Sequence, residues 1–384
     1  MGRIYFKGLN EIRAIAALSV MFHHIELYKH RSHMASLYDT PLLDFIGNLG
    51  KNGVYIFFVL SGFLITYLLL AEKTQRAAID LKKFYIRRIL RIWPLYYLIV
   101  FLSFAILPLL AQNSTALQNE TFYYSCIESL VASPWLALLL FLLFLPNLAL
   151  TLRPPVAGAS QAWSVGVEEQ FYLIWPQLIE RIKKKYLPAA FVLIAFLPLW
   201  VYLLGFVSVK AQKIAHVMIN ILPIYLMATG GIGAYLLFYL KAQIEFYFRN
   251  GFLFMANTAI LIGLLFFPLN KILFGFIVML EILFIIQDNF RFNLRNRFLD
   301  KIGEISYGVY MYHPMIMYFS YAFYNSVIRV DKTGTMYQVL IYCTIPLLTI
   351  FVSQLSYRFF EKRFILYKNR KFTIIASGNA ASEE

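Results

Sequence analysis

The stretch that decides the fold is Leu9–Tyr28, which reads LNEIRAIAALSVMFHHIELY. This apolar run is long enough to enter a bilayer, since a spanning helix needs about 20 residues. Arg13 lies near its start and His24 lies eleven positions later. Eleven helical steps make about three turns and about 16 Å of rise, so the two side chains are predicted on one face. His23 points about 80° away from that face, which suits a structural role better.

Two interpretations of this polar face are open. Ionisable groups inside a spanning helix are costly and usually face a bundle interior or a wet cavity, which would make Arg13 and His24 functional residues. Alternatively, Arg13 snorkels at a helix end beside two buried histidines with structural roles.

Composition indicates an all-α, polytopic integral membrane protein. Of the 384 residues, 60% are hydrophobic and 14% are charged, whereas a soluble domain is about half apolar and a quarter charged. The net charge of +15 falls in short loops between apolar runs. That is the positive-inside pattern, so the charge predicts a lipid bilayer and not a nucleic acid as partner. The two cysteines do not form a disulfide framework.

Apolar runs and basic loops predict about ten crossings with both termini cytoplasmic. The expected spans lie near residues 12–27, 53–70, 93–110, 162–182, 188–207, 215–240, 251–268, 272–288, 302–325 and 337–357. Residues 134–152 would add an odd crossing between two basic loops, so this proline-rich run is predicted to be re-entrant or interfacial. One transmembrane domain is expected over residues 1–372, followed by a disordered cytoplasmic tail over 373–384.

Two segments allow both a structural and a functional interpretation. Residues 53–66 read GVYIFFVLSGFLIT, and a Ser61-Gly62 pair most often forms a close-packing notch between helices. Arg88 and Arg91 lie three residues apart and point one way just beneath the membrane. They are either ordinary positive-inside charge or a guanidinium pair that clamps phosphates.

The segment WSVGVEEQFYLIWP begins at Trp163 and places two glutamates where lipid is expected. Ser164, Glu168 and Tyr172 share a helical face, and Glu169 points about 100° away. A buried carboxylate pair is hard to explain as packing. The sequence alone does not decide which glutamate is functional.

A last segment, GEISYGVYMYHPMI over residues 303–316, carries Ser306, Tyr310 and His313 on one stripe. Together these segments resemble the acyltransferase 3 family, integral-membrane enzymes that O-acylate sugars and other exported molecules. The matching motifs are R-x10-H (Arg13, His24), FFxLSGFLI (57–65), RxxR (Arg88, Arg91), WSxxVEEQFYLxWP (163–176) and SYxxYxxHP (306–314). They occur in the family's order and cover nearly the whole chain.

The resemblance implies an O-acyltransferase of about ten helices in the bacterial cytoplasmic (inner) membrane. An acyl group, expected to be acetyl, would move from cytoplasmic acetyl-CoA or another acyl-CoA to a hydroxyl of an envelope glycan or its lipid-linked precursor. His24 is expected to act as base or acyl carrier, with Glu168 orienting its imidazole. Arg13 would stabilise the oxyanion or bind the donor together with Arg88 and Arg91.

The remaining residues expected to contact substrate are Ser61, Trp163, Ser164, Tyr310 and His313. No metal and no tightly bound cofactor is expected, and the chain could form a homo-oligomer.

Two other functions compete with acyl transfer. A proton-coupled transporter or flippase would use His24, Glu168, Glu281 and His313 as a relay. It is less favoured because no internal repeat is evident and because transport has no need of the arginine pair. A non-enzymatic membrane scaffold would leave the buried glutamates unexplained.

Overall fold

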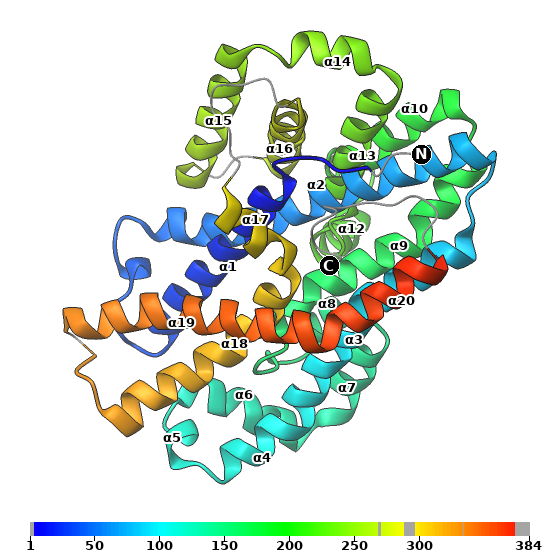
Figure 1. Cartoon of the computed structure of the whole chain (residues 1–384). Helices are drawn as coiled ribbons and strands as arrows, with labels where there is room; N and C mark the ends of the chain where they lie inside the picture. Colours follow the sequence, from blue (N-terminus) through cyan, green and yellow to red (C-terminus); the bar gives the residue numbers. More distant parts are fainter. Residues whose placement is uncertain (1–3, 268–269, 288–295, 333, 373–384) are drawn as a thin grey trace.

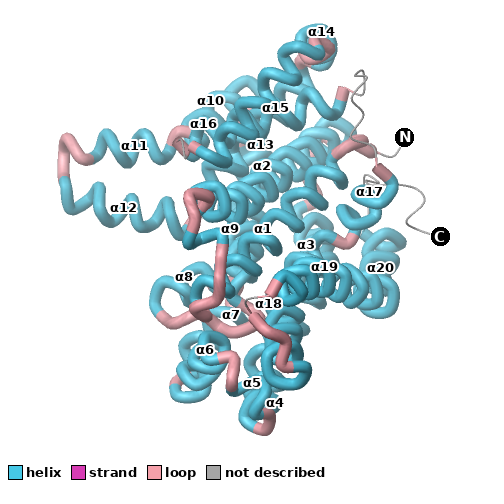
Figure 2. The backbone as a smooth tube through the Cα atoms, turned by 90° about the vertical axis from the view of Figure 1, so that its left-hand side faces the viewer, coloured by secondary structure: helices cyan, strands magenta, loops and turns pink. Residues whose placement is uncertain are grey.

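The structure is a computed structural model that describes residues 4–267, 270–287, 296–332 and 334–372. Within these ranges all the regular elements are helices, as Figure 2 shows. The first half comprises α1 (Leu9–Arg31), α2 (Leu43–Arg76), α3 (Leu81–Phe101), α4 (Leu107–Gln112), α5 (Thr115–Gln118), α6 (Thr121–Ala132), α7 (Pro134–Leu142), α8 (Pro146–Leu152), α9 (Trp163–Arg181) and α10 (Leu187–Ala195). The second half comprises α11 (Leu197–Leu204), α12 (Val209–Ile221), α13 (Ile224–Tyr239), α14 (Lys241–Tyr247), α15 (Gly251–Phe266), α16 (Lys271–Ile286), α17 (Arg297–Glu304), α18 (Ser306–Ala322), α19 (Thr335–Ser356) and α20 (Lys362–Phe372).

Helix α1 is a single unbroken rod inside the bundle (Figure 1). It contains neither proline nor an internal glycine, and at 1.5 Å per residue its 23 residues reach about 34 Å, close to the thickness of a bilayer core. It packs against α2, α17 and α18, and Ala14, Ala16 and Ala17 are fully buried in these contacts. Its last turn is basic, which complements the helix dipole. The helix continues to Arg31, four residues beyond the predicted end of the span at Leu27.

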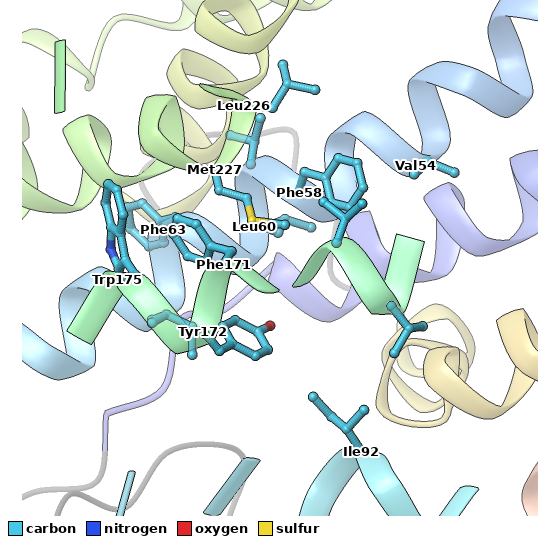
Figure 3. Close-up of a cluster of buried hydrophobic side chains, with 14 of the residues drawn as sticks. Val54, Phe58, Leu60, Phe63, Ile92, Phe171, Tyr172, Trp175, Leu226 and Met227 are labelled. Carbon is cyan, nitrogen blue, oxygen red and sulfur yellow. The ribbon is translucent and has the colours of Figure 1, made fainter. Parts of the chain in front are cut away.

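The core lies where α2 crosses α9 and α13, and Figure 3 shows its aromatic and aliphatic side chains. Helices α2 and α13 approach so closely that a Cβ on Gly62 would collide with the Met227 carbonyl. Gly62 therefore forms the packing notch that its sequence context predicted, whereas its neighbour Ser61 faces α9. Trp175 of α9 closes the core and donates a 2.8 Å hydrogen bond from Nε1 to Thr66 Oγ1.

Three described helical stretches are long and apolar enough to cross a bilayer by length and composition, namely Leu43–Arg76, Leu81–Gln112 and Thr335–Phe372. The number rises to seven if each of four bent helix pairs counts as one span. The chain is therefore an integral membrane protein, but the predicted count of ten crossings and the positions of the termini are not confirmed. The tail expected to be disordered lies outside the described residues.

The predicted spans near 188–207 and 215–240 are each broken in two. Helices α10 and α11 meet at a bend of 56°, and α12 and α13 meet at 64°. Proline explains both breaks, because Pro198 lies in the first turn of α11 and Pro223 directly precedes α13. Neither proline can continue the preceding helix without the loss of a hydrogen bond. Hydropathy reports apolar length and does not register these interruptions.

The proline-rich run at 134–152 folds into two short helices, α7 and α8, which reach about 13 Å and 10 Å. Neither is long enough to cross a bilayer core of about 30 Å. Phe144 lies at the break in the left-handed region, with φ of 57°, and stacks on Tyr96. The broken element predicted from the prolines is present. The membrane face from which it enters stays a prediction.

Candidate active site

The ends of α1 lie in two separate cavities. Near its start, Arg13 lines a cavity of about 270 Å³. We call it the inner cavity because its basic residues are predicted to face the cytoplasm. Near its end, His24 lines an outer cavity of about 280 Å³. About 16 Å of helix rise separates the two residues. One helix therefore connects a basic site to a histidine-lined site.

Three arginines converge on the inner cavity. Arg13 comes from α1, and Arg88 and Arg91 come from α3. Arg88 lies over the rings of Phe84 and Tyr172, at 5.6 and 5.7 Å, and its Nε is buried with no hydrogen-bond partner among the described residues. Within the described part of the chain, none of the three arginines forms an ion pair. Three guanidinium groups around one cavity, with Glu168 as the carboxylate that shares it, are suited to an anionic ligand.

Glu168 of α9 is held in place by two hydroxyl groups. Its Oε1 accepts a 2.7 Å hydrogen bond from Ser61 and its Oε2 accepts one of 3.0 Å from Tyr172. Glu168 lines the inner cavity with the arginines and does not contact His24. The prediction that Glu168 orients the imidazole of His24 is therefore wrong, because the two residues belong to different cavities.

Glu169 points away from the inner cavity, as its position on the helix predicted. Its Oε2 accepts a 3.1 Å hydrogen bond from Trp93 Nε1, and it is not among the residues that line either cavity. Of the two glutamates, Glu168 is thus the one placed to meet a ligand.

A thin wall of hydrogen-bonded residues separates the two cavities at the start of α9. Trp163 lines the outer cavity, while the next residue, Ser164, lines the inner one. Ser164 donates a 2.8 Å hydrogen bond to the hydroxyl of Tyr310, which in turn donates to the carbonyl of Gln161 at 3.0 Å.

His24 meets His313 of α18 in the outer part of the bundle. His24 Nδ1 lies 2.6 Å from His313 Nε2, and the ring centroids are 4.9 Å apart. His313 is fully buried, and its Nδ1 lies 3.3 Å from the carbonyl oxygen of Val309. These contacts were not predicted, because the two histidines are 289 residues apart in the sequence.

The contacts of the histidine pair define its neutral tautomers. A carbonyl oxygen can only accept, so His313 Nδ1 carries the proton and donates to Val309. His313 Nε2 is then an acceptor, and His24 Nδ1 donates to it. This leaves His24 Nε2 with a free lone pair, the arrangement that a base or nucleophile needs. His313 supplies the orienting contact that the sequence had assigned to Glu168.

His23 has a structural environment. Its Nδ1 lies 2.8 Å from the Tyr38 hydroxyl and 3.1 Å from the Ile46 carbonyl oxygen, and its ring fills the space beside Gly50. It does not line either cavity. The difference between neighbouring histidines follows the 100° step of the helix.

Gln161 was not singled out from the sequence. It sits in a short helical turn before α9, where no periodic pattern distinguishes it. Its Nε2 donates to the carbonyls of Gly158 and Met311, at 2.8 and 2.6 Å. Its Oε1 is buried and has no hydrogen-bond partner among the described residues. Gln161 lines the outer cavity.

Fold and site together define a helical integral membrane protein with a basic cavity and a histidine-lined cavity joined by one helix. The chain belongs to the acyltransferase 3 family, whose model, described as an acyltransferase domain, matches residues 6–357. No solved structure matches the chain significantly.

Relatives with names that refer to O-acetyl transfer are similar to this chain over different lengths. The peptidoglycan O-acetyltransferase OatA of Listeria monocytogenes is 28% identical over 46% of this chain and 24% of its own length. YrhL of Bacillus subtilis, provisionally named for the same activity, is 31% identical over the same shares. The provisionally named O-acetyltransferase SACOL0978 of Staphylococcus aureus is 26% identical over 94% of this chain and 57% of its own length. The chain spans between a quarter and a little over half of these relatives.

Proposed function

We propose that this protein is an O-acetyltransferase that moves an acetyl group from acetyl-CoA to a hydroxyl of a bacterial envelope glycan. The observation that carries the proposal is the course of α1, which links a cavity lined by three arginines to a cavity that holds an oriented histidine. Family membership supports the reaction class. The names of the relatives favour a cell-wall glycan as acceptor.

In this proposal the inner cavity binds the donor from the cytoplasm. Arg13, Arg88 and Arg91 would pair with the phosphates of acetyl-CoA, because guanidinium groups bind phosphate oxygens through paired, charge-assisted hydrogen bonds. Glu168 would keep Ser61 and Tyr172 in position at the cavity wall through its two hydrogen bonds. The pantetheine arm would then extend along α1 toward the wall at Ser164 and Tyr310.

His24 Nε2 would carry out the transfer by one of two routes. As a base, it removes the proton of the acceptor hydroxyl, whose oxygen attacks the thioester carbonyl while the CoA thiolate leaves. As a carrier, Nε2 attacks the thioester carbonyl, the CoA thiolate leaves and the acyl group stays on the imidazole. The acceptor hydroxyl then attacks the acyl carbon, the bond from that carbon to Nε2 breaks, and the freed Nε2 takes the hydroxyl proton as the ester forms. In both routes, His313 holds the imidazole through the 2.6 Å contact at Nδ1.

The proposal places the enzyme in the cytoplasmic membrane with the outer cavity open to the envelope side. The basic loops beside α3 support this topology, because the positive-inside pattern predicts Arg88 and Arg91 on the cytoplasmic side. With this topology, acetyl-CoA made in the cytoplasm would modify a glycan on the envelope side, and donor and acceptor would each stay in their own compartment.

The test is transfer by the full chain in proteoliposomes supplied with acetyl-CoA and peptidoglycan strands, with acetyl esters measured by mass spectrometry. His24→Ala should lower the rate by about 10²- to 10⁴-fold, the range for a general base. His23→Ala is the matched control, one residue away and outside both cavities, and should cost much less. Equal losses would contradict the assignment of His24.

A transporter would give a different result in the same vesicles. It would move protons or a glycan across the membrane without forming an ester, and loss of His24 would stop that movement. Proton flux without acetyl ester in the wild type would reject the enzyme and favour the transporter.

A further inference from the structure

Arg31 continues the functional face of α1 beyond His24. Seven residues separate the two, which is nearly two turns, leaves them about 20° apart around the helix and adds about 10 Å of rise. Arg31 therefore lies on the same stripe as Arg13 and His24. It lines the outer cavity with His24, so the stripe carries an arginine on either side of the histidine.

The guanidinium of Arg31 has no acidic partner in the described part of the chain. It is exposed at the cavity and lies 4.8 Å from the ring of Phe122, which also lines the cavity. Such a contact orients a guanidinium without neutralising it. Arg31 is thus a positioned and uncompensated cation.

The neighbouring carboxylates are engaged by other groups. Glu26 pairs with Lys29 at 2.9 Å, and Asp39 pairs with His30 at 2.8 Å. Glu120 accepts hydrogen bonds from Tyr28 and, at 2.8 Å, from Asn325. Because these acidic groups are held elsewhere, the charge of Arg31 remains for a ligand.

The rest of the outer cavity suits a sugar ring. Tyr28, Tyr123 and Trp163 contribute aromatic surface to its wall, and the apolar C–H face of a pyranose packs on such rings. Gln161 adds an amide side chain to this wall, and its Oε1 has no hydrogen-bond partner among the described residues. An apolar wall with a few directed polar groups is the usual composition of a small-ligand site.

We infer that the outer cavity binds an anionic saccharide, whose carboxylate or phosphate pairs with Arg31 while a hydroxyl of the sugar reaches Gln161 and His24. This inference rests on the proposed function and narrows its acceptor from glycans in general to sugars that carry a negative charge. The carboxylate could belong to an acidic sugar and the phosphate to a sugar phosphate or a lipid-linked precursor.

The test measures binding, so it does not depend on acetyl transfer. The full chain in nanodiscs is titrated by calorimetry with three probes: a glucuronic-acid disaccharide, its uncharged methyl ester and N-acetylglucosamine 1-phosphate. The wild type should bind a charged probe about 10- to 150-fold more tightly than the ester, the range for a charge-assisted hydrogen bond. A preference for the carboxylate or for the phosphate identifies the source of the anion.

Arg31→Gln should abolish this preference and leave the affinity for the methyl ester unchanged, and Arg31→Lys should retain part of it. Lys51→Gln is the control, because Lys51 is an exposed cation on α2 that lies outside the cavity. The inference would be overturned if the wild type bound neither the acid nor the sugar phosphate more tightly than the uncharged ester. An unchanged preference in Arg31→Gln would also overturn it.

Transfer to the same probes is assayed separately. If charged probes bind through Arg31 but are never acetylated, the proposed function is contradicted and the anion site is still supported. If neutral and charged probes are acetylated with equal efficiency, the acetyltransferase activity is supported and the anion site is rejected.

Discussion

The contact between His24 and His313 supports a prediction of definite size. Replacing His313 with alanine removes the acceptor that lies 2.6 Å from His24 Nδ1. The N–H of His24 then has no partner at a position from which solvent is excluded, since His313 is fully buried in the wild type. An unsatisfied buried donor costs about 1–3 kcal/mol. If the cost falls on the transition state, kcat/KM for acetyl transfer drops by about 5- to 150-fold.

His313→Gln tests whether the acceptor itself is what matters. A glutamine carbonyl can accept the hydrogen bond from His24, so this variant should recover part of the loss. The KM for acetyl-CoA should stay unchanged in both variants, because His313 does not line the inner cavity. The measurement is steady-state kinetics on proteoliposomes, together with the melting temperature and the pH profile of kcat/KM.

Wild-type kcat/KM in a folded His313→Ala variant would refute the orienting role. So would identical losses in the alanine and glutamine variants with equal melting temperatures, since retention of an acceptor would then have no effect. A role in packing alone would lower the melting temperature of His313→Ala and leave its pH profile unchanged.

Three further predictions concern donor binding, topology and packing. Arg88→Ala and Arg91→Ala should each raise the KM for acetyl-CoA by an amount equivalent to about 1.5–3 kcal/mol, the contribution of a charge-assisted hydrogen bond; unchanged donor kinetics in both variants would return them to ordinary positive-inside charge. A cysteine placed at Arg153 should react with an impermeant thiol reagent from outside the cell, and labelling only after permeabilisation would disprove the parity argument. Gly62→Val should destabilise the protein by about 1–3 kcal/mol, because its side chain would meet the backbone of α13. Gly263→Ala is the control with open space around it, and similar melting temperatures for the two variants would argue against the close helix crossing.

The sequence by itself determined the helical class and the faces of individual helices. Apolar content and basic loops indicated an all-α membrane protein, and the 100° step separated His24 from His23. The same step placed Ser164, Glu168 and Tyr172 on one face, of which Glu168 and Tyr172 are joined by a hydrogen bond. These features depend on local geometry, so a single sequence is enough to predict them.

Only the tertiary structure decided which residues meet across the bundle. The predicted shared face of Arg13 and His24 suggested one site, but neighbouring helices divide that face into two cavities. Packing pairs His24 with His313 and keeps Glu168 with Ser61. Such contacts join segments more than a hundred residues apart, and helical periodicity carries no information about them.

The number of spans and the residues of the outer cavity also depended on tertiary structure. Prolines divide long apolar segments into short helices that meet at an angle, as α12 and α13 do at Pro223. Gln161 and Arg31 gain their positions from a turn and from the last helical turn of α1, where no apolar pattern marks them. The physical reason is that a cavity is formed by several segments at once, while a sequence pattern describes one segment at a time.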